Sequence, residues 1–310
     1  MITRIYAVAI NTFREAVRDK VLYGVLAFAT AVLLFTLALA QLSLNQQLRV
    51  VLDVGLASIS LFSVMVAIFL GSSLLYKEIE RKTLYVILPK PIHRWEFLVG
   101  KHVGITLTGM VFIATMGAVQ FLVTAVQADV PVAQCIGTAA LLAGALGLTA
   151  WRSRDRTAVL VPWSLVALAG SAGLCIAHGV DIRAPLFMLL LSFGEVMVLA
   201  AVALLFSSFS TPFLTGVFTL GVWMLGRSSV DMATMKSKSI APSVRDALHG
   251  LAHIVPNFDS FVPGRNTLIA EHAKFGGDIA YVGATMAYAV LYTVIILMLA
   301  AVIFRRRDFL

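Results

Sequence analysis

Residues 77–101 read KEIERKTLYVILPKPIHRWEFLVGK, a charged stretch with two prolines that separates two long apolar runs. The runs cover residues 54–76 and 97–126, and each is long enough to cross the roughly 30 Å hydrocarbon core of a bilayer. The charged stretch between them is therefore expected in water, at the membrane surface. Its ordered pattern exceeds what a simple chain reversal requires, and we interpret it as a surface that a soluble partner binds.

The composition of the chain agrees with a membrane protein. Hydrophobic residues make up 60% of the 310 residues and charged residues only 13%, and the mean hydropathy is +0.93. Soluble globular chains are about half apolar and about a quarter charged, so that class is excluded. Lipid offers no partner for backbone amides and carbonyls, so each spanning run must be helical. The sequence predicts an all-α, polytopic integral membrane bundle in one transmembrane domain, residues 1–310.

Eight apolar runs are candidate spans, and the basic residues predict their orientation. Starting with the N-terminus inside, the inner segments carry sixteen lysines and arginines, whereas the short outer loops carry Arg49 and Arg183 alone. Short cytoplasmic loops are enriched in basic residues, so both termini are expected in the cytoplasm. The protein is expected in the inner (plasma) membrane. The same distribution argues against nucleic acid as the reason for the net charge of +8. The spans are 21–43, 53–76, 97–126, 132–150, 158–178, 185–207, 212–230 and 281–304.

Two further segments are expected at the membrane surfaces. Residues 1–20 have apolar side chains at helical spacing, with Arg14 and Arg18 on the polar face, which predicts an interfacial amphipathic helix. The external segment 227–280 contains a predicted surface helix over 243–255, with Ser243 as its N-cap. His249 and His253 lie one turn apart in that helix; a solvated pair and a metal site are both compatible with this spacing, and the former is favoured because an acidic third ligand is missing from the pattern.

The motifs of catalysis that we sought are not found in the sequence. There is no G-x-x-x-x-G-K-[ST] loop to bind the phosphates of a nucleotide and no H-E-x-x-H zinc motif. The small residues of 170–173 have the spacing of helix-packing positions rather than that of a serine nucleophile. We therefore expect a chain that is not an enzyme and that binds no cofactor of its own.

Three residues inside the apolar runs carry chemistry of interest. Glu195 lies within the sixth span, where a carboxylate is costly, and either a place on a translocation pathway or an interhelical partner would account for it. Cys135 and Cys175 are both expected near the outer face. They are either two small buried apolar side chains or a disulfide, and the first interpretation is preferred.

The stretch 77–96 is predicted to form a short rigid helix that continues from the second span. Charged residues alternate with apolar ones up to Leu88, and Pro89 and Pro91 end the helix. Trp95 then has the position of an interfacial anchor before the third span.

In these residues the chain resembles the permease subunits of type-2 ABC transporters. The stretch EIERKTLYVILPKPIHRWEFLVGK is similar to the junction between the second and third spans of that family, with its E-R-x-T helix and its R-x-E-F-L-x-G-K sequence. The amphipathic N-terminus, residues 203–223, the ending FRRRDF (304–309) and VPNFDSF (255–261) also agree with it. The family core has six spans, so residues 130–180 are expected to be an additional helical pair.

The resemblance implies a division of labour between chains. Separate ATP-binding cassette subunits would hydrolyse ATP with Mg²⁺, and this chain would pair with a second permease copy, in contact with membrane lipid, to export a substrate. The element 77–96 would be the cytoplasmic coupling helix. The residues expected to contact the ATPase are Glu78, Glu80, Arg81, Lys82, Thr83, His93 and Arg94, with Arg14 and Arg18 of the N-terminal helix as a second contact.

Two alternatives remain at this point. A secondary carrier driven by an ion gradient would need several ionisable residues within the membrane, whereas Glu195 is nearly alone there. An ABC-type assembly or mechanotransmission subunit would move no conventional solute, and the sequence does not separate it from an exporter.

Overall fold

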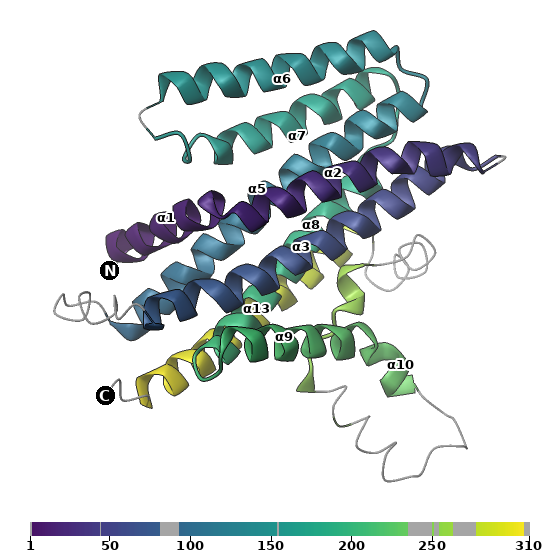
Figure 1. Cartoon of the computed structure of the whole chain (residues 1–310). Helices are drawn as coiled ribbons and strands as arrows, with labels where there is room; N and C mark the ends of the chain where they lie inside the picture. The colour runs from purple at the N-terminus through teal and green to yellow at the C-terminus, as the bar shows by residue number, and fades with distance from the viewer. Residues whose placement is uncertain are drawn as a thin grey trace.

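A computed structural model of the chain describes residues 2–43, 45–80, 93–153, 155–234, 250, 254–262 and 277–306. The elements in this part are all helices, as predicted (Figure 1). They are α1 (Ile2–Arg18), α2 (Lys20–Gln41), α3 (Gln47–Glu80), α5 (Arg94–Gln127), α6 (Val132–Arg152), α7 (Leu160–Ala177), α8 (Arg183–Ser207), α9 (Pro212–Arg227), α10 (Ser229–Thr234), the 3₁₀ turn η1 (Asp259–Phe261) and α13 (Asp278–Arg306).

Seven helices of the described residues are long and apolar enough to cross a membrane. They confirm the prediction of an all-α polytopic bundle. The difference concerns the predicted span 212–230, which is divided between α9 and the short α10. The 16 residues of α9 extend over about 24 Å, which is less than the hydrocarbon thickness of roughly 30 Å. The prediction of this span rested on its apolar residues alone. Apolar character does not indicate that the helix ends at Arg227.

The core of the bundle is built around α5 and α8. Helix α8 packs against α3, α5, α9 and α13, and its residues from Val198 to Ala201 are fully buried. Small residues permit this close packing: a Cβ on Gly71 of α3 would lie 2.4 Å from the Cβ of Ala203. Without a hydrophobic driving force between helices in lipid, such small-residue contacts are what stabilises the bundle.

Helices α6 and α7 form the predicted pair within 130–180. Helix α7 packs on α5, whereas α6 lies further out and contacts both α7 and α5 (Figure 1). Trp163 of α7 donates its indole N–H to the Leu142 carbonyl of α6 at 2.9 Å. Both cysteines are buried free thiols, so the alternative of a disulfide is not realised, and the Cys175 Sγ lies 3.2 Å from the Phe121 carbonyl oxygen of α5.

The ends of the helices fall into two groups. In Figure 1 the marked N- and C-terminal ends lie on the same side of the molecule, together with the end of α3, the start of α5 and the turn between α6 and α7. The α2–α3 and α5–α6 connections lie at the opposite side. The sequence-based orientation assigns the first group to the cytoplasm. We call the two sides the inner and the outer end of the bundle.

Candidate functional site

The N-terminus of α5 lies at the inner end and is capped by its own side chains. His93 precedes the helix, and its backbone N–H donates to the Glu96 Oε2 at 3.2 Å. The Glu96 side chain is almost fully buried, and the Arg4 Nη1 of α1 lies 3.8 Å from the same oxygen. One carboxylate therefore both caps α5 and holds the first turn of α1.

The contact between α1 and α5 depends on two glycines. A Cβ on Gly100 would lie 2.7 Å from the Val8 side chain, and a Cβ on Gly104 would lie 2.6 Å from both the Ala9 carbonyl oxygen and the Thr12 Cβ. This G-x-x-x-G spacing allows two helix backbones to approach closely. The apolar face of the amphipathic α1 is accordingly buried, with Phe13, Ala16 and Val17 almost inaccessible to solvent.

The C-terminal turn of α13 is attached at the same place. Arg94 Nη1 donates to the Phe304 carbonyl at 3.0 Å, a typical use of a cation at the free carbonyls of a helix C-terminus. The rings of Phe97 and Phe304 stack with their centroids 6.4 Å apart. The Arg4–Glu96 ion pair, the Arg94–Phe304 hydrogen bond and the Phe97–Phe304 ring contact thus join the inner ends of α1, α5 and α13.

The predicted coupling residues divide into three groups. Glu78 and Glu80 lie in the last turn of α3, a helix about 51 Å long that exceeds the bilayer core by roughly 20 Å. His93 and Arg94 lie at the start of α5, and Arg94 is bound to α13. Arg81, Lys82 and Thr83 fall outside the described residues, as do His249, His253 and the predicted helix over 243–255 except Gly250, Ile254 and Val255.

The two arginines of α1 differ in their surroundings. The Arg14 Nη2 pairs with the Asp155 Oδ2 of the α6–α7 turn at 2.8 Å, so this charge is directed at the helical pair. Arg18 is exposed at the end of α1. The structure therefore brings the α3 end, His93, Arg94 and α1 to one end of the bundle, whereas it engages Arg14 within the chain.

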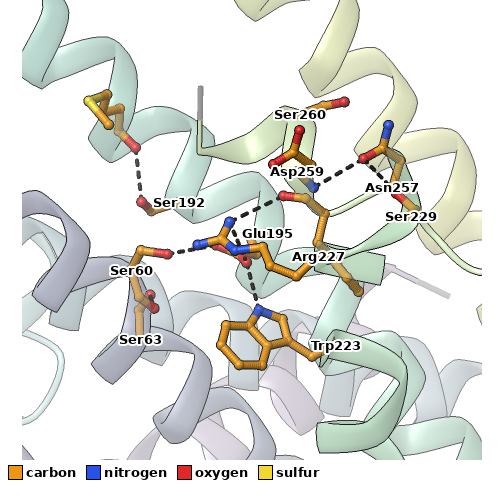
Figure 2. A network of polar contacts seen from close by, with 12 residues as sticks. Ser60, Ser63, Ser192, Glu195, Trp223, Arg227, Ser229, Asn257, Asp259 and Ser260 are labelled. Atoms are coloured by element: carbon orange, nitrogen blue, oxygen red, sulfur yellow. Dashed lines mark hydrogen bonds and ion pairs between the residues drawn. The ribbon is translucent and has the colours of Figure 1, made fainter. Parts of the chain in front are cut away.

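A second polar cluster lies in the middle of the bundle, around Glu195 (Figure 2). Glu195 is fully buried and lies 12 residues from either end of α8, about 18 Å along the helix. Its Oε2 accepts a hydrogen bond from the Ser60 hydroxyl of α3 at 2.9 Å, and its Oε1 accepts one from the Trp223 indole of α9 at 2.8 Å. The Arg227 Nη1 lies 3.6 Å from Oε1. The carboxylate is thus hydrogen-bonded and has a cation beside it.

Arg227 also connects this cluster to the outer segment, residues 254–262. Its Nη1 donates to the Phe258 carbonyl at 3.3 Å, and its guanidinium lies over the Trp223 ring, 5.7 Å from the centroid. The Phe258 amide donates to the Gly226 carbonyl at 3.0 Å. A Cβ on Gly226 would lie 2.3 Å from the Pro256 carbonyl oxygen, so only glycine permits this approach.

Three tyrosines on one face of α13 hold the other side of the outer segment. Tyr281 donates to the Ser260 carbonyl at 2.6 Å, and Tyr292 donates to the Ile254 carbonyl at 2.5 Å. Between them, the Tyr288 hydroxyl accepts the Asn257 N–H at 3.0 Å. The spacing of seven and four residues keeps the tyrosines on one side of the helix. Non-helical backbone at membrane depth needs such internal partners.

Sequence reasoning found Glu195 but not its partners. Ser60, Trp223 and Arg227 come from two other helices, and Arg227 was assigned to the external segment. A signal was present: a buried carboxylate requires a nearby cation, and Arg227 is the first basic residue after it along the chain. A role of Glu195 in translocation stays a prediction. Among the described residues no group of three metal-ligating side chains is found.

Comparison with known proteins finds a family match for residues 6–153. The family model described as ABC-2 family transporter protein matches residues 6–153, from α1 through α6. The match includes the junction 77–101 and also the first helix of the pair that we expected to be an addition to the family core. No curated protein matches the chain. Over residues 6–153, a little under half of its length, this chain is similar to the ABC-2 transporter family, and its described helices make it a multi-pass membrane protein.

Proposed function

We propose that this chain is the non-catalytic permease subunit of an inner-membrane ABC exporter, driven by a separate ATP-binding subunit. The observation that carries the proposal is the joining of helix ends at the inner end. Helix α3 extends beyond the bilayer core, and α1, α5 and α13 are fixed to one another by the Arg4–Glu96 pair and the Arg94–Phe304 hydrogen bond. A subunit that grips residues 77–96 would therefore act on several helices at once.

A route from that end to the outer segment supports the same proposal. Ser60 lies 20 residues before Glu80 on α3, about 30 Å along the same helix. Through Ser60 the helix contacts Glu195, and through Glu195 it contacts α9, Arg227 and the outer segment. A helix is stiff on this length scale, so a displacement of its inner end would be felt at the outer segment.

The partner chains follow from this division of labour. ATP and Mg²⁺ would be held by the ATP-binding subunit. A second copy of a permease would complete the translocation unit, and substrate would pass between the two as the population shifts between inward and outward arrangements. The contact with the ATPase is assigned to Glu78, Glu80, Arg81, Lys82, Thr83, His93 and Arg94, with Arg18 at its margin.

Exchange of the charges at the coupling helix tests the proposal. The variant Glu80→Arg with Arg81→Glu keeps the net charge but reverses the pattern that the partner would recognise. We expect it to insert normally into the membrane, and to lose copurification with the ATP-binding subunit and stimulation of ATP hydrolysis. The matched control is Arg49→Asp with Asp53→Arg, which exchanges an exposed pair, 3.4 Å apart, at the outer end of the same helix. Normal coupling in the first variant would contradict the proposal.

A further inference from the structure

We propose that α1 and the turn between α6 and α7 form a binding site for the headgroup of an anionic phospholipid in the inner leaflet. The two elements are far apart in the sequence and are joined by the Arg14–Asp155 ion pair, with 2.8 Å between Nη2 and Oδ2. This pair brings the basic turn of the outlying helical pair against the basic end of α1. Of the residues used here, Arg18 also lies at the margin of the proposed ATPase contact, whereas Arg152, Asp155 and Arg156 do not.

Arg14 has a hydrogen-bond donor to spare. Its Nε is shielded from solvent and has no acceptor among the described residues. A buried polar group without a partner is rare in native structures. The guanidinium presents its N–H groups as a planar fork, which suits the oxygens of a phosphate. Arg14 Nη2 donates to Asp155, but 38% of the Arg14 side chain is still exposed, so its guanidinium adds positive charge to the site.

The surroundings of this donor are strongly basic and exposed. Arg18 lies one turn further along α1, and Arg152 and Arg156 flank Asp155 in the turn; all three are exposed. The nearby carboxylates are in part already engaged, since Asp155 binds Arg14 and the Asp19 Oδ1 accepts the Val21 N–H at 3.1 Å. Cations in excess at the cytoplasmic surface attract anionic lipid.

The neighbouring side chains favour a lipid over a soluble phosphate. Trp151, at the inner end of α6, is 82% exposed, and tryptophan in this position is typical of the headgroup region of a membrane. Leu148 and Leu141 continue its face of α6 and are 59% and 70% exposed. An acyl chain could lie along these side chains while its phosphate reaches the arginines.

Lipid titration of the purified full-length chain tests this site. Phosphatidylglycerol or phosphatidylcholine is added to the protein in detergent micelles, and bound lipid is measured by native mass spectrometry. We expect the wild type to bind phosphatidylglycerol more tightly, and Arg152→Gln with Arg156→Gln to weaken that binding by about fivefold for each arginine removed. Both side chains are exposed, so the variant is expected to fold, which its thermal midpoint would verify.

The controls separate this explanation from others. Arg49→Gln with Arg183→Gln removes two charges at the outer end and is expected to leave binding unchanged, whereas Arg152→Lys with Arg156→Lys is expected to retain most of it. The proposal is overturned if phosphatidylcholine binds equally well, or if the outer variant loses as much affinity. It is also overturned if glycerol phosphate displaces the lipid at equal concentration. Unchanged lipid binding in the Arg152→Gln, Arg156→Gln variant, with only the copurification of the ATP-binding subunit lost, would overturn it as well.

Discussion

At the scale of single residues, the Glu195–Arg227 ion pair is the contact whose loss we expect to affect the free energy of unfolding. Glu195 is fully buried, whereas 29% of the Arg227 side chain is exposed. Loss of the cation would leave a buried carboxylate without a counter-charge, while loss of the carboxylate would leave an arginine that still reaches solvent. Breaking a buried pair by removing one partner generally destabilises a protein by about 3–5 kcal/mol.

We therefore predict unequal effects of removing the two partners. Arg227→Met is expected to lower the free energy of unfolding by about 3 kcal/mol. Glu195→Gln is expected to cost less than half of that, because the amide can still bond Trp223 and Ser60. The double variant should be more stable than Arg227→Met alone. Unfolding by SDS in mixed micelles measures all three, and strictly additive losses would show that the pair is not coupled.

At the scale of elements, the docking of α1 on α5 depends on the absence of side chains at Gly100 and Gly104. The expected result of Gly104→Ala is a loss of roughly 1–3 kcal/mol, because the new methyl group would overlap the Ala9 carbonyl and Thr12. Gly147→Ala on α6 is the matched control, since a Cβ there meets nothing within 4 Å. Alanine is the better helix former by up to about 1 kcal/mol, so the control should be neutral or stabilising. Equal losses in both variants would contradict the role of the glycines.

The outer segment provides a second prediction at this scale. Tyr288→Phe removes the acceptor of the Asn257 N–H, and an unsatisfied buried donor costs about 1–3 kcal/mol. Local opening of residues 254–262 should therefore become at least about fivefold more frequent. Hydrogen exchange measured by mass spectrometry on this peptide would detect it. Tyr23→Phe is the control, since Tyr23 is 54% exposed and lies on α2. Unchanged exchange in the Tyr288 variant would mean that α13 does not hold the segment.

At the scale of the whole molecule, the alternation of helix ends predicts which loops share a side of the membrane. In a Cys135→Ser, Cys175→Ser background, new cysteines at Asn45 and Asp181 should react with an impermeant maleimide added outside right-side-out vesicles. A cysteine at Arg156 should react only after the membrane is permeabilised. All three positions are exposed in the structure, so access to solvent does not limit the reaction. Labelling of all three from one side would exclude the proposed orientation, and with it the cytoplasmic coupling helix.

The sequence by itself determined the all-α membrane class and the spanning helices other than the predicted span 212–230. Apolar runs of about 20 residues specify spanning helices because the bilayer sets their length, and the amphipathic pattern of 1–20 and the charged stretch 77–101 are local properties of the chain. It also identified Glu195 as unusual, because a carboxylate deep within an apolar run is costly and rare.

Only the tertiary structure decided which side chains meet. Ser60 and Glu195 are 135 positions apart, and Arg14 and Asp155 are 141 apart, so no local pattern could pair them. The end of α9 at Arg227 is a further example, since it lies beside Gly226, where the outer segment approaches the helix closely. These contacts depend on the rotation and relative depth of packed helices. Hydropathy does not encode either quantity, because every face of a helix in lipid can be apolar.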